Sequence, residues 1–288
     1  ALKPRNRIGG RNLQIRLIAF DMDDTLLGAD GQFPEINVRA LRACAARGIR
    51  LALNSGRSFE TLRDFACALG VEPFIISVNG ARVDEGPNGP TLMERVYDDE
   101  HTRVVHEAMR ASGLYYTVYT RGHTYMGNSA QRFLYSRFGH HYAHVSRSGP
   151  YVYEMVDNEE RLRTEGLVHP YKFVALGTEH DPRFQGILNA VSPLNMSISS
   201  SRADNLEVMM PGVDKGTALA FLAKRLGVPR EQVMAFGDNT NDLPMLAYAG
   251  ASVAMENGEE SVRRAARFIA PHHAEGGVGK FLFEKVLV

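Results

Sequence analysis

The chain has 288 residues, of which 44% are hydrophobic and 23% are charged, a composition typical of a globular protein long enough for two domains. Its 33 lysines and arginines equal its 33 aspartates and glutamates, so it lacks the basic excess that favours binding to nucleic acid or to a membrane surface. No apolar run reaches the roughly 18 residues of a membrane-spanning helix. The two cysteines, Cys44 and Cys67, fall in helical patterns, which favours reduced thiols and a cytoplasmic protein.

The first part of the chain alternates short apolar runs with helical patterns. We expect residues 1–14, which are basic and lack the apolar stretch of a signal peptide, to form a mobile tail. Ser58 can cap a helix, and Asn79 with Gly80 predicts a turn. Strands are predicted at 15–20, 51–54 and 74–78, and helices at 34–46 and 58–69.

Residues 85–205 carry a different pattern, in which the predicted strands alternate polar with apolar residues and are rich in aromatic side chains. This mixture predicts an α+β domain inserted into the first one. The exit is expected at 86–90 and the return at 211–216, where proline and glycine interrupt the patterns. Strands are predicted at 115–119, 123–126, 171–176 and 195–199, and helices at 99–112, 129–138 and 181–191.

The last part of the chain returns to helices that alternate with apolar strands. Helices are predicted at 215–226, 242–249 and 259–266, and strands at 233–236 and 251–255. Strands that are apolar throughout are typical of a parallel sheet covered by helices on both faces. The predicted fold is therefore α/β: a doubly wound, Rossmann-like core domain of residues 15–84 and 206–288, with an inserted α+β cap domain of residues 85–205.

Polar side chains gather where the predicted core strands end. Because ligands of open parallel sheets bind beyond the carboxyl ends of the strands, we expect these residues to share one site. Lys215 begins the helix that leads into the strand at 233–236 and can reach the same edge. The strand-end residues are Asp21, Asp23, Asp24 and Thr25, then Ser55, Gly56 and Arg57, then Asn79, and finally Asp238, Asn241 and Asp242.

The chemistry of this set predicts a cation and a phosphate. Clustered carboxylates raise one another's pKa values, so a cluster of this kind indicates a bound cation. Oxygen ligands without histidine or cysteine suit Mg²⁺. Ser55, the Gly56 amide and Lys215 supply hydrogen-bond donors and positive charge for a phosphate. The combination predicts phosphoryl transfer, whereas any single aspartate is equally well explained as a helix cap or turn residue.

The same residues resemble the motifs of the haloacid dehalogenase superfamily of phosphohydrolases. Its DxDxT motif is matched by residues 21–25, its strand-end serine or threonine by Ser55, its lysine by Lys215 and its GDxxND motif by residues 237–242. The segments SGR (55–57), NGA (79–81) and GDNTNDLPML, separated by a long insertion, are similar to the Cof-type branch with a class IIB cap. The resemblance covers the chain from residue 15 onward.

The resemblance implies a role for each acidic residue. Asp21 is the nucleophile that forms an aspartyl phosphate, and Asp23 is the general acid that then becomes the general base. Asp21, the Asp23 backbone carbonyl and Asp238 are the implied Mg²⁺ ligands. Asn241 and Asp242 support the metal shell.

The remaining motif residues are expected to contact the substrate. Ser55, Gly56 and Lys215 hold the phosphoryl oxygens. Arg57 and Asn79 are expected to contact the substrate or to join the cap to the core. Arg202 matches no motif, but it precedes the return to the core, where a cap segment can face the site; an ordinary polar loop explains it equally well.

The favoured function is a Mg²⁺-dependent phosphatase for a small-molecule phosphate ester, with sugar phosphates first and nucleotide-like or cofactor phosphates next. One alternative is a phosphotransferase or phosphomutase with a similar cap. Another is a non-catalytic phospho-receiver or binding module, against which Asp23 and the long insertion argue. The sequence predicts no oligomeric state.

Two histidine pairs do not add to the predicted site. His140 and His144 lie four residues apart, but no glutamate or cysteine completes a zinc set beside them. His272 and His273 lie between Pro271 and a glycine-rich run, and we expect them in a solvated loop.

Overall fold

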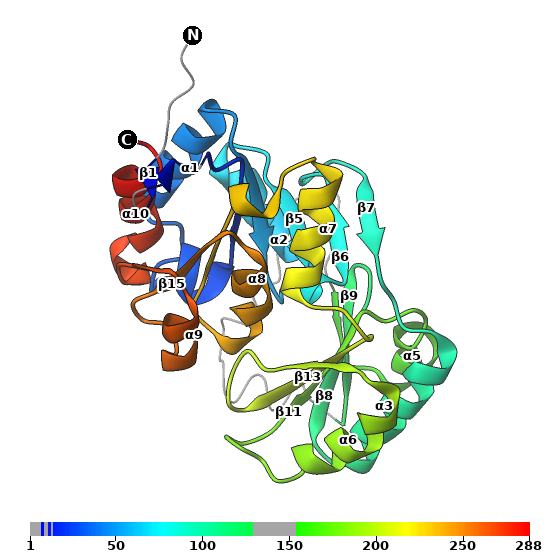
Figure 1. Cartoon of the computed structure of the whole chain (residues 1–288). Helices are drawn as coiled ribbons and strands as arrows, with labels where there is room; N and C mark the ends of the chain where they lie inside the picture. Colours follow the sequence, from blue (N-terminus) through cyan, green and yellow to red (C-terminus); the bar gives the residue numbers. More distant parts are fainter. Residues whose placement is uncertain (1–6, 9–10, 13, 129–153) are drawn as a thin grey trace.

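The structure is a computed structural model that describes residues 7–8, 11–12, 14–128 and 154–288. Two β-sheets organise the chain, and we name their domains the core and the cap (Figure 1). The expected tail at 1–14 lies largely outside the described residues. Within it, β1 (Arg7–Ile8) and β2 (Arg11–Asn12) pair as a short antiparallel ladder.

The core sheet has eight strands in the order β16-β15-β14-β3-β4-β5-β6-β7. The first six are parallel, and β6 and β7 add an antiparallel edge. Because the chain winds outward from β3 in both directions, the prediction of a doubly wound core is confirmed. The strands are β3 (Leu17–Phe20), β4 (Arg50–Asn54), β5 (Phe74–Ser77), β6 (Arg82–Asp84), β7 (Thr91–Glu94), β14 (Val233–Gly237), β15 (Ala251–Met255) and β16 (Phe268–Ala270).

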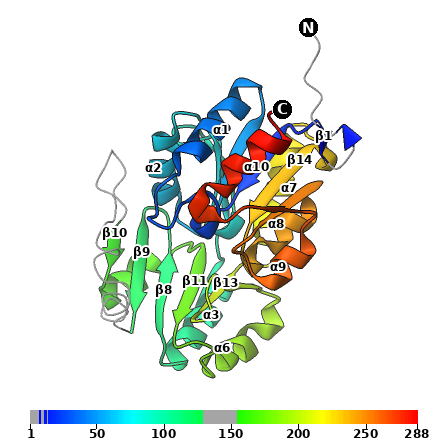
Figure 2. The same ribbon diagram turned by 90° about the vertical axis from the view of Figure 1, so that its left-hand side faces the viewer.

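Helices cover both faces of the core sheet, and the alternation of side chains along each strand supplies both interfaces (Figures 1 and 2). In β3, Ile18 and Phe20 pack toward α1 (Glu35–Ala46), α2 (Phe59–Leu69) and α10 (Gly277–Lys285). Leu17 and Ala19 pack toward the helices of the opposite face, α7 (Lys215–Arg225), α8 (Leu243–Tyr248) and α9 (Glu260–Ala265). All four β3 side chains are fully buried, which explains why the strand is apolar throughout.

The cap sheet has six strands in the order β10-β9-β8-β11-β13-β12, all antiparallel to their neighbours except β10 and β9. One face packs against α3 (Asp99–Ala111) and α6 (Phe184–Val191) through alternate residues such as Tyr116, Phe173 and Val208. The intervening residues therefore lie on the face away from these helices. The strands are β8 (Tyr115–Tyr119), β9 (His123–Gly127), β10 (Glu154–Val156), β11 (Lys172–Leu176), β12 (Ser197–Ser199) and β13 (Asn205–Met209).

The chain crosses between the two sheets at 95–98 and 210–214. The expected boundaries at 84/85 and 205/206 therefore need correction, because β7 belongs to the core sheet and β13 to the cap sheet. The proline and glycine at 211–216, where the return was expected, do mark the observed second crossing, whereas the boundary at 205/206 cut β13 off from its sheet. The predicted helix at 129–138 and the pair His140 and His144 lie outside the described residues. Among the described helices, none is long and apolar enough to cross a membrane.

Candidate active site

The first part of the site is the loop that follows β3. The Asp21 N–H donates to a β14 carbonyl at 3.0 Å, which fixes the start of the loop in the sheet. Residues 22–26 then form one wide helical turn, closed by an N–H to C=O bond of 2.9 Å. Within this turn Asp24 takes a left-handed conformation with φ of 54°, which aspartate tolerates better than most residues. The loop buries Asp21 and leaves the Asp23 side chain 56% exposed.

Lys215 joins two of the predicted acids. Asp214 caps α7 by accepting the first free N–H groups of the helix, and Lys215 is the residue that follows. The Lys215 Nζ lies 2.6 Å from an Asp21 oxygen and 2.6 Å from an Asp242 oxygen. Its carbonyl accepts a hydrogen bond of 3.0 Å from the Asn54 amide at the end of β4. The loops after β3 and β14 thus meet at the buried Lys215 ammonium, and β4 holds the backbone of the same residue.

The loop after β14 holds Asp238 and Asp242 in different ways. One Asp242 oxygen accepts the N–H groups of Asp238 and Asn239 at 2.9 and 3.1 Å, while the other pairs with the lysine. Gly237 is required at the end of the strand, because a Cβ there would lie 2.5 Å from the Asp242 Cβ. Asp238 accepts a 2.6 Å hydrogen bond from the Thr25 hydroxyl, which leaves its second oxygen available to a ligand.

The electrostatics of this cluster fit a divalent cation. Ligand atoms of Asp21, Asp238 and Asp242 all lie within 4.8 Å of one another. Burial and the neighbouring acids raise the pKa of Asp21 well above its usual value, although Lys215 opposes the shift. Burial, followed by Asp242, raises the pKa of Asp238 to about 7. Three carboxylates beside one ammonium leave an excess of negative charge, so these residues can hold a metal ion bound by oxygen atoms.

The second loop, residues 55–57, follows β4 and carries the predicted phosphate ligands. Ser55 is almost fully buried, and its hydroxyl oxygen accepts the Arg57 N–H at 3.3 Å. A Cβ at Gly56 would lie 2.8 Å from the Asn79 Oδ1, so a larger residue there would displace the Asn79 side chain. The Arg57 guanidinium binds both oxygens of Asp23, at 2.8 and 2.6 Å. The Asp23 side chain therefore points to this loop and not to the acidic cluster.

The other predicted residues fall in different places. Asn79 is buried with a left-handed φ of 55°, and its side-chain amide donates to Glu207 of the cap, so it joins the two domains. Arg202 forms an ion pair of 3.2 Å with Asp204, two residues away. Asn241 lies partly buried in the turn 240–242 beside the cluster.

Three residues near the site were missed by the sequence analysis. Lys172 and Glu207 are buried cap residues that contact the core, and nothing in the alternation of their strands marked them as functional. The expectation of a solvated loop was wrong for His273, which is only 7% exposed. Its Nδ1 lies 2.8 Å from the Leu27 carbonyl and its Nε2 lies 3.5 Å from an Asp24 oxygen, so it braces the first loop.

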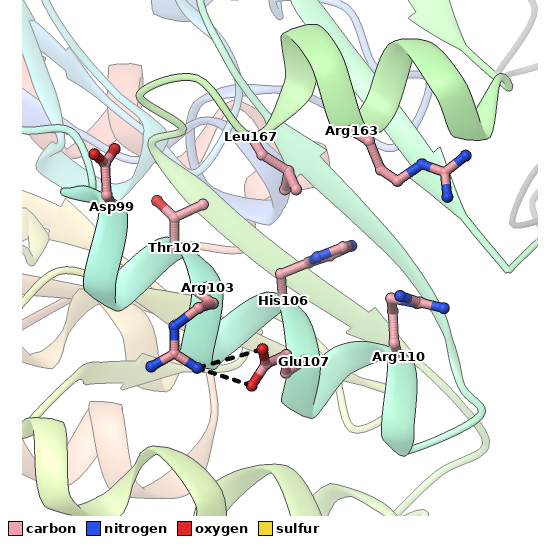
Figure 3. Close-up of a pocket in the computed structure, with 8 residues that line it drawn as sticks. All are labelled: Asp99, Thr102, Arg103, His106, Glu107, Arg110, Arg163 and Leu167. Carbon is pink, nitrogen blue, oxygen red and sulfur yellow. Dashed lines mark hydrogen bonds and ion pairs between the residues drawn. The ribbon is translucent and has the colours of Figure 1, made fainter.

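A separate hollow of about 420 Å³ lies on the cap, over α3 and the segment 162–167 (Figure 3). Arg103 there is paired with Glu107, and the His106 ring bonds the Tyr116 hydroxyl at 3.0 Å. Arg110 and Arg163 also line it (Figure 3). None of the predicted site residues lines this hollow, so the acidic cluster remains the candidate active site.

Fold and site together define a capped α/β enzyme of the phosphoryl-transfer type, and comparisons with known proteins agree. The profile of the haloacid dehalogenase-like hydrolase family matches residues 18–282. The 5-amino-6-(5-phospho-D-ribitylamino)uracil phosphatase YcsE of Bacillus subtilis is 26% identical, over 96% of this chain and 98% of its own length. An HMP-PP phosphatase of Cronobacter sakazakii is 31% identical, over 84% of each chain.

A solved structure shares the fold of both domains. The subclass IIB sugar phosphatase BT4131 superposes with a TM-score of 0.77 at 20% identity, over 95% of this chain and all of its own. The chain belongs to the haloacid dehalogenase-like hydrolase family and is a phosphatase, and its cap shares the fold of a subclass IIB phosphatase. The expected family, fold class and enzyme class are thereby confirmed.

Proposed function

We propose that the chain is a Mg²⁺-dependent phosphohydrolase that removes phosphate from a small phosphorylated metabolite through an aspartyl phosphate at Asp21. The observation that carries this proposal is the Lys215 ammonium, held 2.6 Å from both Asp21 and Asp242, with Asp238 in the same cluster. A buried carboxylate beside positive charge is the arrangement that an attack on phosphorus needs.

In the first step an Asp21 oxygen forms a bond to phosphorus while the bond between phosphorus and the ester oxygen breaks. The leaving alkoxide takes a proton from Asp23, whose exposed side chain can meet a substrate that enters between the domains. In the second step water attacks phosphorus, Asp23 takes a proton from that water, and the Asp21 carboxylate is restored. Arg57, which binds Asp23 through two hydrogen bonds, keeps this carboxyl group at the site between turnovers.

The phosphoryl group would be held by groups from three loops. The Ser55 hydroxyl and the Gly56 amide would donate to its oxygens, and Lys215 would offset their charge. Asp21, the Asp23 carbonyl and Asp238 would hold Mg²⁺, whose positive charge lowers the repulsion between the carboxylate and the phosphoryl oxygens. Asp242 would orient Lys215 and the loop after β14, since it accepts two backbone N–H groups there.

We infer sugar phosphates and related polyol phosphates as the first substrate class. YcsE is named for a phosphorylated ribityl compound and BT4131 is described as a sugar phosphatase, although the fold alone is shared with the latter. Nucleotide-like and cofactor phosphates form the second class. The cap would exclude bulk water while the phosphoryl group is transferred to Asp21, and it would select the leaving group.

The test is release of inorganic phosphate from a panel of phosphorylated sugars, nucleotides and cofactors, with Mg²⁺ and with a chelator. We expect release that requires Mg²⁺ and that disappears in the Asp21→Asn variant. A parallel reaction with added free sugar separates hydrolysis from transfer, because a phosphotransferase would form a new sugar phosphate. Folded protein that releases no phosphate from any ester, or that keeps a stable phosphoryl group without turnover, would contradict the proposal.

A further inference from the structure

The face of the cap sheet that turns away from α3 and α6 carries a buried ion pair. Lys172 of β11 is 2% exposed and Glu207 of β13 is 4% exposed. The Lys172 Nζ lies 3.2 Å from a Glu207 oxygen and 4.7 Å from the centre of the Tyr119 ring. Tyr119 is directly opposite Lys172 in the sheet, so the lysine is enclosed from two sides within the cap.

The same two side chains reach across to the core. The Lys172 Nζ donates to the Gly56 carbonyl at 3.0 Å, and the Glu207 carboxylate accepts from the Asn79 side-chain amide. The Asn79 backbone N–H in turn donates to the Ser55 carbonyl at 3.0 Å. The cap therefore contacts the Gly56 carbonyl directly through Lys172. It is connected to the Ser55 carbonyl through Asn79.

The bond to Gly56 has a consequence for the next peptide unit. In a trans peptide the C=O and the following N–H point in opposite directions, so the orientation of the Gly56 carbonyl also sets that of the Arg57 N–H. That N–H donates to the Ser55 hydroxyl oxygen at 3.3 Å. With its oxygen engaged as an acceptor, the Ser55 hydroxyl has its hydrogen available for another acceptor.

Packing alone does not explain a charged pair at this place. Two ions taken out of water often contribute less to stability than apolar side chains of similar size, and apolar packing is already available nearby. Val78, Tyr171, Met209 and Val213 form an apolar cluster at the same junction of cap and core. What the ammonium adds is a directed hydrogen bond to the loop that carries Ser55.

We propose that Lys172 is a positioning residue for phosphate binding: from the cap, it orients the Gly56–Arg57 peptide so that the Ser55 hydroxyl faces the phosphoryl group. Glu207 holds both Lys172 and Asn79 for this task. The inference rests on the proposed function and extends it: the loop at 55–57 takes its phosphate-binding conformation only when the cap contacts the core and Lys172 binds the Gly56 carbonyl.

The test compares Lys172→Met, Glu207→Gln, the double variant and Lys172→Arg with the wild-type enzyme. Lys224→Met, which removes an exposed lysine of α7, is the matched control. The readouts are the thermal unfolding midpoint, kcat and KM for p-nitrophenyl phosphate, and the affinity for inorganic phosphate by calorimetry. The last readout does not depend on turnover.

We expect Lys172→Met to lower the midpoint and to lower kcat/KM and phosphate affinity by about tenfold to hundredfold, the usual cost of a displaced binding group. The double variant should unfold at nearly the wild-type temperature, because it no longer buries an unpaired charge. Its kcat/KM and its phosphate affinity should stay low. Lys172→Arg should keep part of the kcat/KM and part of the phosphate affinity that Lys172→Met loses, since a guanidinium also donates to a carbonyl. Lys224→Met should match the wild type.

Two results would overturn the inference: a double variant that regains phosphate affinity together with its midpoint, or a Lys172→Met variant with unchanged phosphate affinity. A wild-type enzyme that hydrolyses no ester would contradict the proposed function instead. In that case weaker phosphate binding by Lys172→Met and by the double variant would still support the role of Lys172. Wild-type protein that binds no phosphate would contradict both the proposed function and the role of Lys172.

Discussion

The core and the cap place their charged residues in different parts of a β-sheet. In the core, the central strands β3 and β14 are apolar throughout, and the acids and the lysine of the site lie in loops and at a helix start beyond the strand ends. In the cap, Lys172 and Glu207 lie within strands, on the face opposite the helices. The core therefore builds its site from loops that share one edge of the sheet. The cap instead contributes charged side chains that the register of neighbouring strands brings together.

This difference separates two kinds of variant. Substitutions in the core loops should remove the chemistry for every phosphate ester, whatever its leaving group. Substitutions on the inner face of the cap sheet should leave the reacting groups in place and change how well the phosphate and its leaving group are held.

The largest effect is expected for Asp21→Asn. An amide cannot act as the nucleophile, so kcat should fall by at least about 10³-fold for all substrates of the panel. Lys215 keeps its pair with Asp242, and the unfolding midpoint should change little. Steady-state kinetics and thermal unfolding of the same preparation check both statements. If Asp21→Asn hydrolysed any ester at a rate comparable to the wild-type rate, the nucleophile would be another residue.

Asp23→Asn should come next, with kcat lowered by about 10² to 10⁴-fold, the usual contribution of a general acid and base. The loss should be smaller for p-nitrophenyl phosphate, whose leaving group needs less protonation, than for a sugar phosphate. Asp24→Asn is the matched control, because Asp24 is the adjacent exposed aspartate and asparagine tolerates its left-handed backbone. Equal losses in the two variants would mean that the shape of the loop, and not the Asp23 carboxyl group, is responsible.

Much of the core could be predicted because its organisation is local. Each parallel strand is short, apolar and followed by its own polar loop, and all carboxyl ends of such strands meet at one edge. The meeting of Asp21, Lys215, Asp238 and Asp242 followed from that rule. The rule does not extend to the cap, where Lys172 and Glu207 are 35 residues apart and meet only through the pairing of β11 with β13.

Two further features depended on contacts that no local pattern contains. The Asp23 side chain was expected to act as acid and base, but its pairing with Arg57 was not foreseen, because the wide turn after β3 directs it toward the loop after β4. His273 has a polar, glycine-rich neighbourhood in the sequence, yet it is buried against Leu27, 246 positions earlier in the chain. A prediction from composition placed it in solvent for that reason.

Asp238→Asn should raise the Mg²⁺ concentration needed for half-maximal activity by at least about tenfold, since even indirect partners of a metal ligand change affinity by that factor. The control is Thr25→Val, which removes only the 2.6 Å hydrogen bond to Asp238 and should give a smaller shift. A Mg²⁺ titration of activity measures both. An unchanged requirement in Asp238→Asn would place the cation elsewhere.

The smallest effect concerns the stability of the metal-free protein. The pKa of Asp238 is raised to about 7 in the folded chain, so between roughly pH 4 and pH 7 the folded state binds more protons than the unfolded state. Stability should therefore fall as the pH rises through this range, by at most about 1.4 kcal/mol per pH unit from this group. Mg²⁺ should weaken the trend, because it favours the ionised carboxylate. Thermal unfolding in a chelator at several pH values tests this, and Asp238→Asn should flatten the profile.

The central claim is that phosphate passes through a covalent bond to Asp21. The most direct measurement mixes the enzyme with its best panel substrate and Mg²⁺, stops the reaction with acid within one turnover, and reduces the acyl phosphate with borohydride. Peptide mass spectrometry then finds the aspartate that has become homoserine. The account predicts this product at position 21 in the wild-type enzyme and at no position in Asp21→Asn. Reduction at a different aspartate, or steady turnover with no trapped acyl phosphate, would contradict it.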